Sequence, residues 1–192
     1  MHQASDRRPT TGGADQNKLE LELLARIAAR DAQAMHELYQ LYHRRLGRFL
    51  MRLTSRYDLA EEVINDTFWV IWQHAADFRG ASQVSTWIFG ITYRRALKTL
   101  KRVRPDQVAE DAEAVEQVED PWLQADLREW LGVALAKLPY EQRMVLELAY
   151  HVGHSCEEIA TIMECPVNTV KTRMFHARRK LKDLLGSLAG AL

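Results

Sequence analysis

The chain has few of the features that mark a secreted, membrane-spanning or catalytic protein. Its 192 residues include two cysteines, too few for a disulfide framework, and Cys156 and Cys165 lack the CxxC spacing of a metal or redox site. No apolar run approaches the ~20 residues that cross a bilayer, and residues 1–17 lack the apolar segment of a signal peptide. Gly-rich phosphate loops and the GxSxG and HExxH motifs are absent. These absences predict a cytoplasmic, non-enzymatic protein without cofactor, metal ion or membrane insertion.

The charge of the chain is balanced overall but unevenly distributed. Lys and Arg together number 26, as do Asp and Glu, so the formal net charge is zero. Residues 105–130 hold nine acidic side chains and one basic one, whereas basic side chains outnumber acidic ones in 19–104 and in 131–192. Because the neutral total arises from an acidic strip between two basic blocks, it does not exclude a nucleic-acid partner.

Helical periodicity runs through most of the sequence. From 19 to 104 no proline occurs, and apolar residues recur at steps of three and four. The periodicity returns after Asp120-Pro121, a pair that suits the start of a helix. Cap and turn residues divide the two blocks into eight predicted helices: 19–29, 31–54, 58–77, 85–103, 121–137, 140–151, 155–163 and 167–186.

The remaining segments set the domain boundaries. Residues 1–17 offer almost nothing to bury, which predicts a disordered tail. Residues 105–120 are acidic and free of aromatics, which predicts an extended, flexible linker. We therefore expect an all-α fold in which two small helical modules, 18–104 and 121–192, are joined by this acidic linker.

The end of the chain has the pattern of a helix-turn-helix. Ser155 and Glu158 fit a capping box that opens a short helix, Glu164-Cys165-Pro166 ends it, and an amphipathic helix follows. Six Lys or Arg and no acid lie between 167 and 182. Such a helix can enter the major groove, where polar side chains reach base edges and cations bind phosphates. The simpler alternative is a solvated basic face on a surface helix.

The segment 58–73 places acids and tryptophans on the same side of a helix. Asp58, Glu62 and Asp66 fall opposite the apolar residues, and Trp69 and Trp72 project among the acids. Acids at i,i+4 spacing repel, and exposed tryptophans are unusual. The pattern favours a binding surface for a basic protein partner over a solvated acidic face. A paired-carboxylate hydrolase is disfavoured because no pocket encloses the acids.

Aromatic and basic residues gather in the segment 78–104. Trp87, Phe89 and Tyr93 precede a run, 94–104, that holds six basic side chains and no acid. Aromatics beside a cationic track suit single-stranded nucleic acid, because bases stack on the rings while cations follow the backbone. At helical spacing, Trp87 and Phe89 also fit a buried core, so both roles stay open.

Four motifs follow one another along the chain: DLAEEVINDTFWVIW, FRGASQVSTWIFGITYRRALKTLKR, LPYEQRMVLEL and EEIATIMECPVNTVKTRMFHARRKL. In this order they resemble the bacterial extracytoplasmic-function (ECF) sigma factors, which are promoter-specificity subunits of RNA polymerase. The resemblance covers nearly all of residues 23–185 and implies a sigma-two-like module at 18–104 and a sigma-four-like helix-turn-helix module at 121–192.

The resemblance implies three binding surfaces. The first would bind core RNA polymerase, which contributes its beta-prime clamp helices and its beta subunit, through Asp58, Glu61, Glu62, Asn65, Asp66, Phe68 and Trp69. The second would melt promoter DNA and capture the minus-ten element on the non-template single strand, through Trp87, Tyr93, Arg94, Arg95, Lys98, Lys101 and Arg102. The third would bind the minus-thirty-five element as duplex DNA, through Asn168, Thr169, Lys171, Thr172, Arg173, His176 and Arg178. An anti-sigma factor that covers both modules is a further expected partner.

The sequence departs from the family pattern at several positions. Ile91-Thr92-Tyr93-Arg94 replaces an IARN-like stretch, and Lys98 stands where Asp is frequent, so the preferred minus-ten sequence does not carry over. Glu164 occupies a turn position usually held by Gly, which costs roughly 1 kcal/mol if the backbone there is left-handed. Asn168 also replaces a frequent Gly, a change compatible with a base contact.

Two other functions compete with a sigma factor. A sigma mimic would sequester an anti-sigma factor without binding DNA, but it need not keep basic faces, and the mimics of this type carry a receiver domain for which this chain has no room. A stand-alone helix-turn-helix regulator leaves the surface of acids and tryptophans unexplained.

Four residues suggest chemistry that their surroundings do not support. His151, His154 and Cys156 form a weak zinc or redox pattern, because no second cluster accompanies them. Cys165 is better explained as a small residue that fits the turn than as a sensor of oxidants. Trp122 and Trp130 are expected to pack the core of the second module.

Overall fold

Two helical modules make up the structure. The computed structural model describes residues 11–54, 56–103 and 125–189, and every regular element within these ranges is a helix, as predicted. The first module holds α1 (Thr11–Ala28), α2 (Ala32–Met51), α3 (Tyr57–His74), the 3-10 turn η1 (Ala75–Asp77) and α4 (Val84–Val103). The second holds α5 (Ala125–Ala136), α6 (Tyr140–Leu146), the π-helical turn η2 (Glu147–Val152), α7 (Cys156–Met163) and α8 (Val167–Ala189).

The helix boundaries agree with the predicted ones within a few residues, except at the start of α1, and the predicted start of the fifth helix at 121 lies outside the described residues. Residues 11–17 were expected in a disordered tail but are helical. Asn17 explains part of this difference, because its side-chain oxygen accepts a hydrogen bond from the Val84 N–H at the start of α4, at 3.1 Å. Residues 1–10, the predicted linker and Trp122 lie outside the described residues, and Trp130 lies in α5.

Local sequence signals account for several helix ends. Asp31 caps α2, where its carboxylate accepts hydrogen bonds from the N–H groups of Gln33 and Ala34 at 2.9 and 3.1 Å. Ser155 and Glu158 form the predicted capping box of α7. Glu164 ends α7 with φ 51° and ψ 46°, so the backbone is left-handed at the position where Gly is usual.

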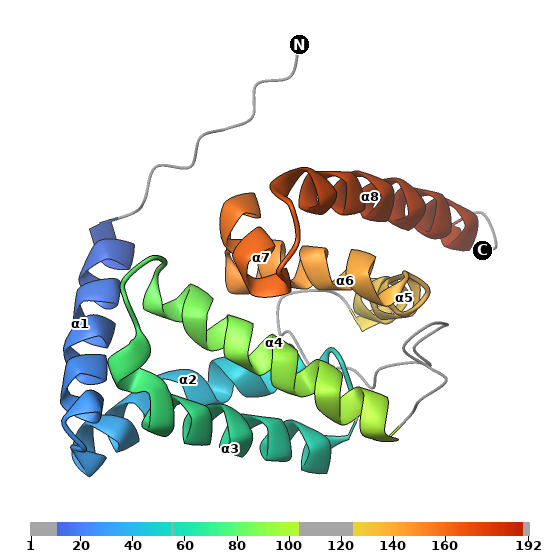
Figure 1. Cartoon of the computed structure of the whole chain (residues 1–192). Coiled ribbons are helices and arrows are strands. Elements are labelled where there is room, and N and C mark those ends of the chain that lie inside the picture. Colours follow the sequence, from blue (N-terminus) through green and yellow to red (C-terminus); the bar gives the residue numbers. More distant parts are fainter. Residues whose placement is uncertain (1–10, 55, 104–124, 190–192) are drawn as a thin grey trace.

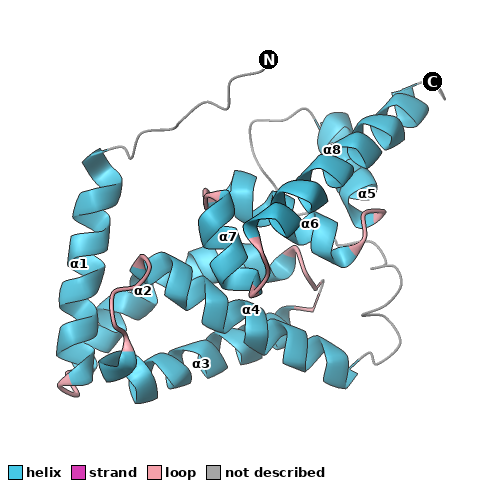
Figure 2. Ribbon diagram, turned by 45° about the horizontal axis from the view of Figure 1, so that its top comes forward, coloured by secondary structure: helices cyan, strands magenta, loops and turns pink. Residues whose placement is uncertain are grey.

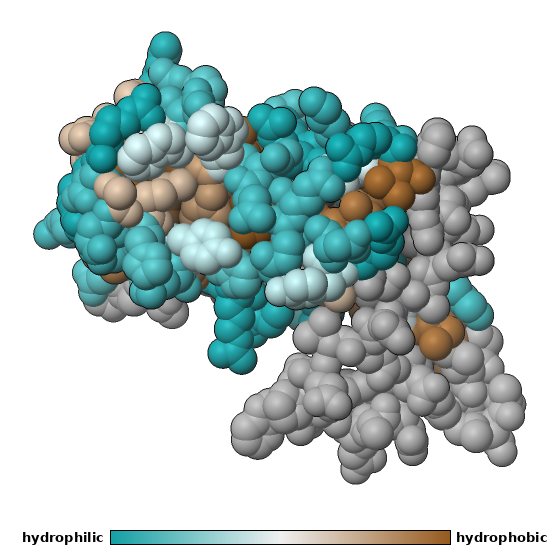
Figure 3. Space-filling view, turned by 90° about the horizontal axis from the view of Figure 1, so that it is seen from below, coloured by the Kyte–Doolittle hydropathy of each residue, from teal (hydrophilic) through white to brown (hydrophobic). Residues whose placement is uncertain are grey.

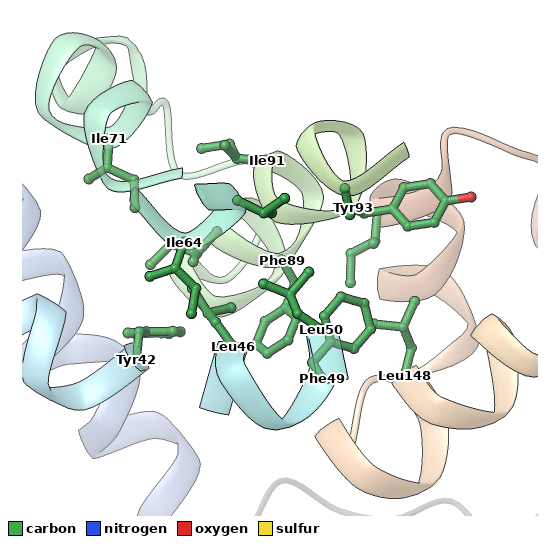
Figure 4. Packing of buried hydrophobic residues seen from close by; sticks show 14 of the residues in the cluster. Tyr42, Leu46, Phe49, Leu50, Ile64, Ile71, Phe89, Ile91, Tyr93 and Leu148 are labelled. Carbon is green, nitrogen blue, oxygen red and sulfur yellow. The ribbon is translucent and has the colours of Figure 1, made fainter. Parts of the chain in front are cut away.

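One hydrophobic core runs through both modules. Figure 1 shows the second module stacked on α4, and Figure 2, from another side, shows α7 next to the same helix. In the close-up of Figure 4, Phe49 and Leu50 of α2 and Phe89 of α4 lie near Leu148 of η2. The sequence predicted two modules on a tether, whereas the structure packs them against each other.

Helix α4 lies at the centre of this arrangement. It contacts α3, α1 and α2 within its own module and α7 of the other. A helix enclosed on most sides needs apolar or small residues around most of its circumference, and its first half has them. The buried residues are Val84, Thr86, Ile88, Phe89, Gly90, Ile91, Thr92, Tyr93, Ala96 and Thr99.

Candidate functional site

The acids of α3 lie on its outer face, where two of them pair with arginines and a third lies beside a histidine. Arg56 donates to Asp58 at 2.5 Å, and this guanidinium lowers the pKa of Asp58. His43 lies 3.1 Å from Glu61, and Arg102 of α4 donates to Glu62 at 2.7 Å. The repulsion expected between Asp58 and Glu62, four residues apart, is therefore relieved by Arg56 and Arg102, which the helical pattern did not reveal.

The rest of this face is open. Asn65 is exposed and Asp66 half-buried, and within the described residues neither side chain has a hydrogen bond or ion pair. Trp69, one turn beyond, is 63% exposed. Figure 3 views the molecule from the side of α3 and shows a mainly hydrophilic surface with scattered paler and brown groups. An exposed indole is a frequent anchor of a protein–protein interface, and an unpaired carboxylate beside it can pair with a cation of the partner.

Two aromatic residues of α3 pack toward the core: Phe68, which falls on the apolar side of the helix although the resemblance assigned it to the polymerase-binding surface, and Trp72, which was expected among the acids. Phe68 is 5% exposed, and its ring centre is 4.8 Å from that of Tyr39, so it supports the helix from the core and does not reach its outer face. Trp72 was expected among the acids. It packs partly against the core instead, and the Arg30 guanidinium lies 5.4 Å from the centre of its ring.

The predicted minus-ten residues divide into covered and accessible ones. Trp87 is half-buried against Phe78, with ring centres 5.2 Å apart, and Tyr93 is only 6% exposed. Arg94 is exposed, and its guanidinium donates to Glu164 of the second module at 2.9 Å. The others lie toward the end of α4, exposed apart from the half-buried Arg95: Arg95, Lys98, Lys101 and Arg102.

Sequence analysis did not identify Asn17 as part of this region. Its bond to Val84 fixes the start of α4, directly after the loop 78–83. Asn17 is 67 residues away in sequence and lies in a polar segment without periodicity, so no local signal could have shown its role.

Helix α8 presents most of the predicted minus-thirty-five residues to solvent. Asn168, Lys171, Thr172, His176 and Arg178 are exposed, and Thr169 is half-buried. Phe175, which the sequence analysis did not select, is 61% exposed among them. Arg173 is half-buried and donates to Glu141 of α6 and to the Cys165 sulfur.

The two histidines near α7 each lie beside a carboxylate. His151 lies 2.8 Å from Glu147 and His154 lies 3.6 Å from Glu158. His154, with the N–H of Ser155, lowers the pKa of Glu158 to about 2. In the described part of the chain, no group of three or more His, Cys, Asp or Glu is arranged to hold a metal ion. No helix there is long and apolar enough to span a bilayer.

Comparison with known families explains the two-module arrangement. Residues 38–105 match the family described as Sigma-70 region 2, and residues 128–181 match that described as Sigma-70, region 4. The class is thus that of sigma-70-type transcription factors, which are regulators of transcription. The region 4 match runs from within α5 to most of α8 and includes the helix-turn-helix.

Individual relatives narrow this class. The RNA polymerase sigma-H factor of Pseudomonas aeruginosa is 30% identical over 181 residues, which cover 87% of this chain and 94% of that protein. The ECF RNA polymerase sigma factor SigM of Mycobacterium tuberculosis is 33% identical over 182 residues, which cover 94% and 92%. The chain belongs to the ECF RNA polymerase sigma factors.

Solved structures agree with this assignment. CnrH, in complex with the cytosolic domain of CnrY, has a TM-score of 0.67 and 22% identity, with 88% of this chain and 98% of that chain covered, which shows the shared fold. The sigma factor RpoE from Bartonella quintana, in complex with the anti-sigma factor NepR, has a TM-score of 0.62 and 26% identity, with 79% and 96% covered. The predicted sigma-factor function is confirmed, and the sigma-mimic alternative is not favoured.

Proposed function

We propose that α3 binds the beta-prime clamp helices of core RNA polymerase, that α4 and the loop before it capture the minus-ten element, and that α8 binds the minus-thirty-five element. The second module would also contact the beta subunit. The observation that carries the proposal is the open part of α3, where Trp69 is 63% exposed beside Asp66 and Asn65. Such a face gains most from a partner that covers the indole and supplies a cation.

A charge reversal on α3 tests the polymerase surface. Asp66→Lys is expected to abolish binding of core RNA polymerase, measured by co-elution and by fluorescence anisotropy, with unchanged circular dichroism. Glu22→Lys is the matched control, because Glu22 is an exposed acid on α1, and it should bind like the wild type. If Asp66→Lys keeps wild-type affinity for core enzyme, α3 is not the docking helix.

The duplex-binding role of α8 rests on exposed side chains near its start. Asn168, Lys171 and Thr172 lie in its first two turns, where a helix in the major groove reaches base edges and phosphates. In vitro transcription with core enzyme, followed by mapping of start sites, would identify the promoters. Lys171→Ala should reduce promoter-specific RNA, whereas Lys18→Ala, which changes an exposed lysine on α1, should not.

An anti-sigma factor is the proposed regulator. The support is the similarity to RpoE, whose structure is a complex with the anti-sigma factor NepR. Co-purification of the tagged chain from its own cells, followed by mass spectrometry, is expected to recover a protein that blocks transcription in the reconstituted assay. A co-purified protein that leaves transcription unchanged would argue against this regulation.

A further inference from the structure

Two side chains from α1 and from the turn after it bind the backbone on either side of the loop 78–83, which belongs to the proposed minus-ten surface. The Asn17 side-chain oxygen accepts a hydrogen bond from the Val84 N–H, the first of α4, at 3.1 Å. Arg30, directly after α1, donates from its guanidinium to the Trp72 carbonyl in the last turn of α3, at 2.8 Å. Figures 1 and 2 show the segment that leads from α3 to α4 running alongside α1.

Both contacts are made to helix ends, where the backbone needs partners from outside the helix. The first N–H groups and the last carbonyls of a helix lack intrahelical hydrogen bonds. Val84 begins α4, and Trp72 lies in the last turn of α3. Because a helix rises by about 1.5 Å per residue, Asn17 and Ala28 lie roughly 16 Å apart along the axis of α1. The length of α1 therefore sets the separation between the end of α3 and the start of α4.

The loop 78–83 is largely exposed. Four of its six residues are open to solvent. Gly80 has a left-handed backbone, with φ 70°, and no atom beyond its neighbours in the chain lies within 4 Å of the place that a Cβ would take. At the start of the loop, the Phe78 ring packs against Trp87 of α4. The conformation of the loop therefore depends mainly on how its two ends are held.

The backbone of Arg30 is itself strained. Its φ of 67° lies in the left-handed region, which a glycine would adopt without cost. The arginine side chain makes two contacts that a glycine lacks: the hydrogen bond to the Trp72 carbonyl, and a position over the Trp72 ring, 5.4 Å from its centre. A strained residue whose side chain holds the end of a neighbouring helix points to a positioning role.

We propose that Asn17 and Arg30, held at the two ends of α1, position the loop 78–83 to capture the unpaired bases of the minus-ten element. Both are positioning residues, because they act on the loop through Val84 and Trp72 and need no contact with DNA. This role rests on the proposed function, in which the loop and α4 bind the minus-ten element. A loop that is already held in shape loses less conformational entropy when it captures bases, so both contacts should favour strand opening.

Removing the Asn17 contact tests this role in holoenzyme, formed with core RNA polymerase on a promoter mapped by its start site. Asn17→Ala is expected to reduce open-complex formation, measured by the permanganate reactivity of unpaired thymines, about fivefold, the factor that corresponds to one hydrogen bond. Core-enzyme affinity and binding of the duplex minus-thirty-five element should stay unchanged. Asn17→Asp keeps an acceptor oxygen and should restore opening. Asp15→Ala, which changes an exposed residue of the same helix, is the matched control.

Replacing Arg30 separates positioning from folding. Arg30→Gly removes both contacts to Trp72 but relieves the left-handed backbone, so thermal unfolding should stay close to that of the wild type. Open-complex formation should nevertheless fall about fivefold. A merely structural role would change the melting temperature and leave opening per folded molecule as it is in the wild type.

Amide hydrogen exchange reports the two contacts in the free protein. In Asn17→Ala, the amide of Val84 and those of the loop 78–83 should exchange about fivefold faster than in the wild type, because one hydrogen bond no longer opposes local opening. Arg30→Gly should speed exchange in the same loop. The amides of α8 should exchange at the wild-type rate in both variants.

A chain in which Gly-Ser-Gly-Ser replaces residues 79–82 separates the failure of this role from the failure of the proposed function. If that chain opens promoters like the wild type, the loop does not capture the minus-ten element and this part of the proposed function is rejected. If it fails to open them while Asn17→Ala and Arg30→Gly open them normally, the proposed function stands and the role of α1 is overturned. An equal loss of opening, core-enzyme binding and duplex binding in Asn17→Ala and Arg30→Gly would also overturn it.

Discussion

Helices α4 and α8 share a sequence feature but differ in how much of their surface other helices cover. Both are amphipathic, and both carry a run of Lys and Arg without an acid. Ten residues of α4 are buried, because the first module covers one side and α7 another. The start of α8 keeps its polar side chains in solvent. A basic periodic segment thus predicts a helix and its cations, but the neighbours decide which side chains stay free to bind.

The largest expected difference is in stability, between alanine variants of one phenylalanine in α4 and one in α8. Phe89 of α4 is fully buried against Phe49 and His154, whereas Phe175 of α8 is 61% exposed. Phe89→Ala should lower the free energy of unfolding by about 3–5 kcal/mol, since it leaves a cavity. Phe175→Ala should change it by less than about 0.5 kcal/mol. Urea unfolding at pH 7 measures both, and equal losses would contradict the contrast in burial.

A pH series tests the carboxylate that links α7 to α4. The folded-state pKa of Glu158 is lowered from 4.5 to about 2, so its ionised form stabilises the fold above pH 4.5, and this stabilisation is lost as pH falls through about 2. Glu158→Gln should cost on the order of 2 kcal/mol at pH 7, and the difference from wild type should shrink below pH 4.5. Glu157→Gln, next to it and exposed, should follow the wild type at every pH.

Removing the side chain that caps α4 is expected to lower the stability by a smaller amount. Asn17→Ala removes the side-chain acceptor for the Val84 N–H and should lower the free energy of unfolding by about 1 kcal/mol. Asp15→Ala changes an exposed residue of the same helix and is expected to have no measurable effect. Thermal unfolding compares the two variants, and equal stability would show that the Val84 N–H gains nothing from the Asn17 side chain.

The smallest expected effect is on the salt dependence of DNA binding, which distinguishes the phosphate contacts of α4 from those of α8. Lys171→Ala should reduce the slope of log affinity against log salt by about 0.9 for duplex DNA, because one phosphate contact is lost. Lys98→Ala should leave the duplex slope unchanged and reduce the slope for single-stranded DNA by about 0.7. Anisotropy titrations at several salt concentrations give these slopes. A reversed pattern would exchange the DNA forms proposed for α4 and α8.

Local chemistry made much of the fold predictable. The capping box of Ser155 and Glu158 and the left-handed Glu164 depend on a few neighbouring residues, so the sequence pattern reveals them. The buried stripe of α8 follows in the same way from Val170, Met174 and Ala177.

Contacts between distant segments were not predictable from one sequence. The bonds Asn17–Val84, Thr86–Glu158 and Arg94–Glu164 join residues 67 to 72 positions apart, and no periodicity encodes such pairs. The acids of α3 are a further example. The helical pattern predicted that they share a face, but it did not predict that Glu62 pairs with Arg102. Which residues of a candidate site are available to a partner is decided by such pairings.

The central position of α4 also governs how the free protein loses its structure. Because α4 contributes side chains to the packing of both modules, unfolding of either module removes packing contacts from the other. Scanning calorimetry of the free chain should therefore give a single endotherm, with equal calorimetric and van't Hoff enthalpies. The two modules would thus act as one cooperative unit despite the long segment that joins them.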